Sequence, residues 1–193
     1  MLRGAIGINE DQPMKCYYLT LLIVVLFRAT AFGQIDTGQS TSNTPYDQYL
    51  GPMRQTYLKL SGEPASIDEV RSLMRTARRF RYYFDAAKPY VPQLPQVTEA
   101  KRTGDCKAKS LWLISKMGDP KARYVIGKGS RSSAIAHAWL LWCNGGTWYI
   151  LDPTNEFELM SADRVVGRKC IPRYSYKGFS SYRHPTYSQY FKE

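Results

Sequence analysis

The chain has 193 residues, of which 44% are hydrophobic, so it is long enough for one compact domain and too short for two large ones. Its 27 basic and 16 acidic residues give a formal net charge of +11, which favours contact with polyanions such as nucleic acid, anionic lipid or cell-wall polymer. No pair of cysteines or histidines has the spacing of a zinc site, so we expect neither a metal centre nor a cofactor.

The first 33 residues have the features of an export signal. A 12-residue apolar run at 16–27 follows Lys15 and is too short to span a membrane comfortably, but small residues follow it as in a signal peptide. Met14 would serve as an ordinary start, which would make residues 1–13 a mis-called beginning. We therefore expect a periplasmic or extracellular protein, with an uncleaved anchor as the alternative. Export makes a nucleic-acid partner unexpected, and membrane contact is expected only through this segment if it is uncleaved.

The next segments predict a linker followed by two helices. Residues 34–45 are small and polar and are expected to form a flexible linker, so that a single domain spans residues 46–193. One helix is expected from about Met53. A second helix begins after Ser66, because Ser66 and Glu69 form a capping box and apolar residues follow at helical spacing. Its opposite face carries five arginines, which suits either a solvated face or a polyanion-binding stripe.

The middle of the chain predicts the main elements of the core. Residues 88–96 contain three prolines and are expected to be extended. Residues 105–117 predict a largely buried helix that Gly118 ends. A strand is expected at 122–128, and HAWLLWCNGGTWYILDP, residues 137–153, is typical of a β-hairpin.

The hairpin turn decides which side chains face each other. With Asn144-Gly145 as a two-residue turn, His137 faces Asp152, close enough for the carboxylate to accept an imidazole N–H. A three-residue bulged loop would instead place Asp152 opposite Ala138. Taken alone, the pair suits a purely structural role equally well.

Cys106 begins the predicted buried helix, where the free N–H groups and the helix dipole stabilise a thiolate. An isolated cysteine there would more often be a small buried residue. Together with His137 and Asp152, however, it fills three roles at once: nucleophile, proton carrier and orienting carboxylate. His184, the other histidine, lies in the tail, where no such partner is expected.

The C-terminal part leaves two alternatives open. The three cysteines outside the signal are an odd number for an oxidising compartment, which favours one pair and one free thiol, and Cys143 and Cys170 are the candidate pair. The tail, residues 168–193, is basic and rich in tyrosine. We favour a tail that lies back on the core over one that binds an anionic polymer.

The motifs GDC at 104–106, HAW at 137–139 and LDPT at 151–154 resemble the transglutaminase-like superfamily, in particular the small exported bacterial transglutaminase-like cysteine peptidases. The resemblance covers about residues 80–155. It implies an α+β, papain-like or transglutaminase-like core, in which a helix bearing the nucleophile packs on an antiparallel sheet. It also implies that Cys106, His137 and Asp152 form the catalytic triad.

The sequence departs from this family next to the nucleophile. Many bacterial members carry acidic residues just after the cysteine, whereas Lys107 and Lys109 stand here. This weakens the case for a cation site and suggests an anionic or acceptor-rich substrate face. Gln93 and Gln96 lie upstream, where papain-like enzymes place a glutamine, and are candidates for the second oxyanion donor; Tyr90 is another.

These observations predict an exported thiol acyl-transfer enzyme, a cysteine peptidase or amidase that forms a thioester with a protein or peptide substrate. A small domain without an acceptor-binding module favours hydrolysis over the first alternative, a cross-linking transamidase. The second alternative is a non-catalytic envelope domain that binds an anionic cell-envelope polymer. The three intact triad residues argue against it, because a binding domain has no need of them.

Overall fold

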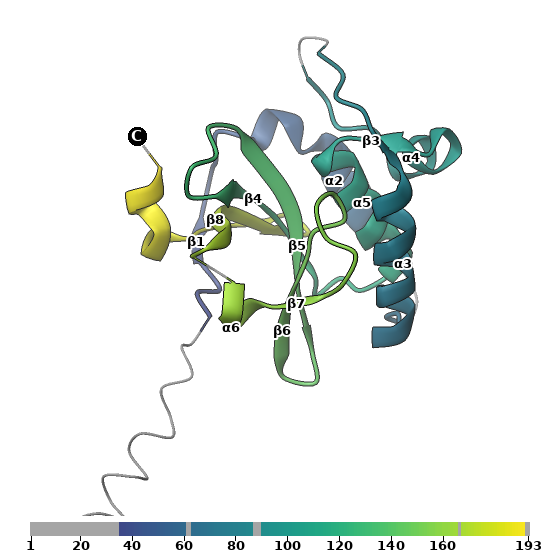
Figure 1. The fold of residues 1–193 in the computed structure, drawn as a ribbon. Coiled ribbons are helices and arrows are strands. Elements are labelled where there is room, and N and C mark those ends of the chain that lie inside the picture. The colour runs from purple at the N-terminus through teal and green to yellow at the C-terminus, as the bar shows by residue number, and fades with distance from the viewer. Residues whose placement is uncertain (1–34, 61–62, 87–89, 166, 192–193) are drawn as a thin grey trace, which may run out of the picture. The chain divides into compact units, whose positions relative to one another are not determined.

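The structure, a computed structural model, describes residues 35–60, 63–86, 90–165 and 167–191. The predicted export signal lies outside these ranges. The described chain is α+β, as the sequence predicts, with helices packed on a seven-stranded antiparallel sheet (Figure 1). None of the helices in the described ranges is long and apolar enough to cross a membrane.

The sheet has the strand order β1-β9-β8-β4-β5-β6-β7. Its strands are β1 (Gln39–Thr41), β4 (Arg123–Ser130), β5 (Ala136–Asn144), β6 (Thr147–Leu151), β7 (Met160–Ser161), β8 (Lys169–Lys177) and β9 (Ser180–Arg183). The basic tail therefore supplies β8 and β9 and lies on the core, as favoured from the sequence. A separate parallel pair, β2 (Arg81–Tyr82) and β3 (Thr103–Gly104), leads the chain into the nucleophile helix.

One helix, α5, lies at the centre of the helical layer, where it contacts β5 and is packed against α2, α3 and α4 (Figure 1). The helices are α2 (Gly51–Leu58), α3 (Ile67–Arg79), α4 (Pro95–Lys101), α5 (Cys106–Met117) and α6 (Ala162–Val165), with 3-10 turns η1 (Asp47–Tyr49) and η2 (Pro185–Tyr190). This packing holds α5 against β5, the first strand of the predicted hairpin.

Helix α3 begins where the sequence predicts. The backbone N–H of Glu69 donates to the Ser66 hydroxyl, and the Glu69 carboxylate accepts the N–H of Ser66 at 2.7 Å, which completes the capping box. The apolar face buries Val70, Met74 and Ala77 against the core. The cap and this face together fix α3 beside α5.

Helix α5 also agrees with its prediction, because its circumference is apolar and its two ends are capped. Leu111, Leu113 and Ile114 are fully buried, and each such side chain contributes roughly 1.5–3 kcal/mol of transfer free energy. Gly118 ends the helix with φ of 66°, a left-handed conformation that glycine adopts without steric cost.

The predicted hairpin register is wrong by two residues. The structure places Gly145 and Gly146 at the turn, with φ values of 56° and 78°, and pairs Asn144 within the strands. Two consecutive glycines satisfy the two positive φ angles more easily than Asn144-Gly145. Because the shift is an even number of residues, it keeps Asp152 on the predicted side, but beyond the end of β6 rather than opposite His137.

Two segments expected to lack regular structure contain some. Gln39–Thr41, in the predicted flexible linker, pair with β9 and so cover a strand edge that would otherwise be open. Pro95, in the segment expected to be extended, begins α4. Proline is tolerated there because the first turn of a helix leaves its N–H groups unbonded.

Candidate active site

The three predicted catalytic residues come from three elements and meet at one end of the sheet. Cys106 is the first residue of α5, His137 is the second of β5, and Asp152 directly follows β6. His137 Nε2 lies 2.8 Å from Asp152 Oδ2. Cys106 and His137 line one cavity of about 560 Å³.

The imidazole of His137 is poised between two acidic groups. Burial by itself lowers the pKa of His137, but hydrogen bonds with Asp152 and Cys106 outweigh it and raise this pKa to about 10. Because Nε2 is bonded to Asp152, Nδ1 is the ring nitrogen left for the thiol. An imidazolium in this position stabilises a neighbouring thiolate.

Asp152 is buried and held by its own turn. The N–H groups of Thr154 and Asn155 donate to its Oδ1 at 3.1 and 3.3 Å, and the Asn155 side-chain amide donates to Oδ2 at 2.9 Å. Burial raises the pKa of Asp152, but the bonds to His137, Asn155 and Thr154 hold it below its usual value. Asn155 also lies 3.1 Å from His137 Nε2. Asn155 was not predicted as a site residue, although it ends the run LDPTN, in which turn residues follow a strand.

A second network surrounds the nucleophile. Asp105 caps α5 by accepting the N–H of Ala108 at 2.9 Å, and its other oxygen accepts the Tyr90 hydroxyl at 2.5 Å. Lys107 Nζ lies 2.7 Å from the same carboxylate and 4.0 Å from Cys106 Sγ. Burial lowers the pKa of Lys107, but Cys106 and Asp105 raise it above its usual value. A permanent positive charge therefore stands beside the sulfur.

The three candidate oxyanion donors differ in where they lie relative to the Cys106 cavity. Gln96 is exposed on α4, and Gln93 is partly buried with an Oε1 atom that makes no hydrogen bond. Neither glutamine lines the cavity, whereas Tyr90 does. The Tyr90 hydroxyl is donated to Asp105, so the backbone N–H of Cys106 is the oxyanion donor that the geometry supports best.

The cavity walls are largely aromatic. The rings of Phe84 and Tyr90 stack at 5.4 Å between centroids over one side, and Tyr82 lies in the same wall. The aromatic residues of the wall are Tyr46, Tyr49, Tyr82, Phe84, Tyr90 and Tyr124. A lining of this kind suits contact with an apolar group.

The other two cysteines in the described ranges, Cys143 and Cys170, are free, so the disulfide considered from the sequence is not formed. Burial raises the pKa of the Cys170 thiol, whose sulfur lies 4.0 Å from Asp152 Oδ2. In the described part of the chain, no group of three histidine, cysteine, aspartate or glutamate side chains could hold a metal ion.

The expectation that His184 has no partner is wrong. Its ring is buried, with Nε2 2.9 Å from the Ser175 hydroxyl and Nδ1 3.7 Å from Asp36 Oδ1. No local pattern predicts this arrangement, because the three residues are brought together by the pairing of β1, β8 and β9. The site lies apart from the residues that line the Cys106 cavity.

Neither a protein-family model nor a curated protein matches the chain in sequence. Among solved structures, calcium-bound LapG from Legionella pneumophila matches with a TM-score of 0.50 and 19% identity, over 69% of this chain and 76% of that one. EGTA-treated LapG gives 0.48 and 20%, over 68% and 74%. A candidate cysteine protease from Cytophaga hutchinsonii gives 0.39 and 20%, over 58% and 39%. The match to calcium-bound LapG shows that the chain shares the α+β fold of that protein, with helices packed on an antiparallel sheet, which confirms the predicted fold.

Proposed function

We propose that the chain is an exported cysteine peptidase or amidase with Cys106, His137 and Asp152 as its catalytic triad. The observation that carries the proposal is the arrangement of these three residues. Cys106 and His137 line one cavity, and His137 Nε2 lies 2.8 Å from Oδ2 of the buried Asp152 carboxylate. A nucleophile, its base and the group that orients the base are thus aligned.

The proposed reaction passes through a thioester. The Cys106 thiolate attacks the carbonyl carbon of an amide, and the backbone N–H of Cys106 stabilises the oxyanion that forms. Protonated His137 then gives its Nδ1 proton to the amide nitrogen, the C–N bond breaks, and the amine leaves. His137 next takes a proton from water as the water oxygen attacks the thioester. The acid product leaves and the sulfur returns to its starting state.

The nucleophile that attacks the thioester decides whether the reaction is hydrolysis, as in a peptidase, or amine transfer, as in a transamidase. A lysine amine that reaches the thioester in place of water would give a cross-link at the same Cys106. We favour water, because the described residues form one compact domain and none of them makes up a separate module for an acceptor. Export rests on the apolar run at residues 16–27.

The test is mass spectrometry of the full chain incubated with a peptide library and a free primary amine. We expect pairs of fragments from cleaved amide bonds with the wild type and with Cys143→Ala, and none with Cys106→Ala. Addition of the amine to glutamine side chains would show transamidation instead. Peptides left unchanged by the wild type, or equal products with Cys106→Ala, would overturn the proposal.

A further inference from the structure

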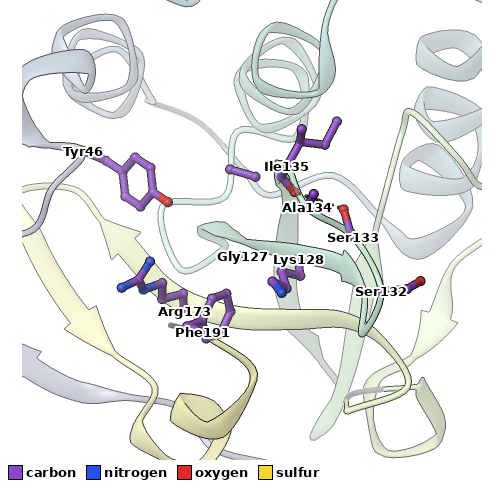
Figure 2. Close-up of a pocket in the computed structure, with 10 residues that line it drawn as sticks. Tyr46, Gly127, Lys128, Ser132, Ser133, Ala134, Ile135, Arg173 and Phe191 are labelled. Atoms are coloured by element: carbon purple, nitrogen blue, oxygen red, sulfur yellow. Dashed lines mark hydrogen bonds between the residues drawn. The ribbon is translucent and has the colours of Figure 1, made fainter. Parts of the chain in front are cut away.

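A second cavity of about 490 Å³ lies beside the active-site cavity, and Figure 2 shows the residues that line it. The two cavities share Tyr46, Ile135 and Ala136 as lining residues, while Cys106 and His137 line only the first. A peptide whose carbonyl carbon lies at Cys106 therefore has the second cavity next to it.

The second cavity is positively charged. Lys128 and Arg173 line it, and no aspartate or glutamate does. No aspartate or glutamate in the described residues forms an ion pair with Lys128 or Arg173. Lys128 Nζ and Arg173 Cζ lie instead 5.9 and 5.1 Å from the centre of the Phe191 ring. Two cations gathered at one ring repel each other, so a bound anion would relieve this repulsion.

Arg173 owes its position to a β-bulge. Along β4 and β8, Ile126 pairs with Tyr174, but the next residue, Gly127, pairs with Pro172, so Arg173 is the extra residue of β8. Bulges redirect side chains and are frequent beside active sites. The arginine is thus placed by the backbone and not by a flexible surface loop.

Gly127 makes this bulge possible and ties it to the catalytic strand. A Cβ atom at Gly127 would lie 2.0 Å from the carbonyl oxygen of Ile171, so β8 approaches more closely than any other residue would allow. On its other side Gly127 pairs with His137 of β5. The bulge therefore sets Arg173 on the strand next but one to the catalytic base.

A third donor faces the same space. The Tyr46 ring packs edge-on against Tyr174 at 5.9 Å, and its hydroxyl is turned into the cavity, across from Lys128 and Arg173 (Figure 2). A guanidinium fork, an ammonium and a phenolic O–H together match the oxygens of a carboxylate.

We propose that this second cavity is a specificity subsite for a carboxylate, the Asp or Glu side chain of a peptide whose scissile bond lies at Cys106. The inference rests on the proposed function, because the subsite adjoins the cavity that Cys106 and His137 line. A peptide C-terminus carries the same carboxylate chemistry, and the test separates the two sources.

The first test compares N-acetylated, C-amidated peptides that carry Glu or Gln at one position, scanned along the peptide, with Gln peptides that have a free C-terminus. We expect a preference for Glu at one position of about tenfold to hundredfold in kcat/KM. Arg173→Met and Lys128→Met should each reduce this preference. Lys177→Met, exposed at the end of the same strand, should leave it unchanged. A preference only for the free C-terminus, or a Glu preference that both variants retain, would overturn the proposal.

The second test measures binding of the same peptides to Cys106→Ala by calorimetry, which needs no turnover. Tighter binding of the Glu peptide, lost in Cys106→Ala/Arg173→Met, supports the subsite even if the wild type cleaves nothing, in which case only the proposed function fails. Cleavage without any preference for Glu, in rate or in binding, overturns the subsite and leaves the proposed function standing.

Discussion

His137 links the two halves of the proposed chemistry, because its ring nitrogens serve different partners. Nε2 is bonded to the buried Asp152 carboxylate, and Nδ1 is left for Cys106. These partners raise the pKa of His137 to about 10, so the ring carries its proton at neutral pH and can give it to a leaving amine.

Replacing the carboxylate should undo this. In Asp152→Asn we expect the pKa of His137 to fall from about 10 towards its ordinary value of about 6.5, because a neutral amide no longer favours the imidazolium. The rate of peptide cleavage should fall by about 10²- to 10⁴-fold. NMR titration of the histidine ring protons measures the pKa, with His184 as a control in the same spectrum. A His137 pKa that stays near 10 in the variant would contradict the assignment.

Lys107 is expected to assist the thiolate through its charge. Lys107→Met removes the ammonium 4.0 Å from Cys106 Sγ and leaves the Asp105 carboxylate unneutralised beside it. The rate of Cys106 alkylation by iodoacetamide at pH 7 should fall about tenfold. The control is Lys116→Met, which removes a surface lysine of the same helix that pairs with Glu99. Equal rates in the two variants would show that Lys107 does not act on the sulfur.

The residues of the site differ in how well the sequence predicts them. Cys106 and His137 stand out because a helix start and a hairpin end are local patterns. The hydrogen bond from Tyr90 to Asp105 joins residues that are 15 positions apart in the chain, which no local pattern reveals. Gln93 was a candidate by its place upstream of the cysteine alone, and it is not among the residues that line the cavity.

At the scale of elements, local signals predict helices well and strand pairing poorly. The capping box that starts α3 and the glycine that ends α5 act within a few residues, so their helices begin and end as expected. Strands β8 and β9 were not predicted, because Pro172 interrupts the strand pattern and β8 pairs not only with its neighbour β9 but also with β4, whose partner residues are 39 to 52 positions away. Proline is tolerated in β8 because it lies at the bulge.

The β-bulge between β4 and β8 leads to a prediction about stability. Gly127→Ala places a Cβ atom 2.0 Å from the Ile171 carbonyl oxygen, so β4 and β8 must move apart. We expect the free energy of unfolding to fall by about 1–3 kcal/mol, measured by urea denaturation. Gly51→Ala, which meets no atom within 4 Å, is the matched control. Wild-type stability in Gly127→Ala would mean that the close approach of the two strands is not required.

At the scale of the whole domain, the two ends of the described chain are joined at His184. Its buried ring lies between Asp36, at the start of the described residues, and Ser175 of β8. Burial lowers the pKa of His184 to about 4; the nearby Asp36 partly opposes this shift, and Arg123 reinforces it. The folded protein therefore requires a neutral ring.

The stability of the domain should depend on pH through this ring. Because the pKa of His184 is lower in the folded than in the unfolded protein, the neutral ring stabilises the fold fully above about pH 6.5. This contribution to the free energy of unfolding is lost as the pH falls from about 6.5 through about 4. Between these pH values, the free energy of unfolding should therefore decline less steeply in His184→Gln than in the wild type. Parallel curves for the two proteins would exclude His184 as the cause.

The most direct measurement of the central claim is the rate at which each cysteine reacts with iodoacetamide at pH 7, followed by mass spectrometry of the full chain. Cys106 is 4% exposed, while Cys143 is more accessible, so accessibility alone favours Cys143. If His137 activates the sulfur, Cys106 reacts faster than Cys143, and His137→Ala slows Cys106 while leaving Cys143 unchanged. Slower reaction at Cys106 than at Cys143, or a Cys106 rate that His137→Ala does not change, would contradict the account.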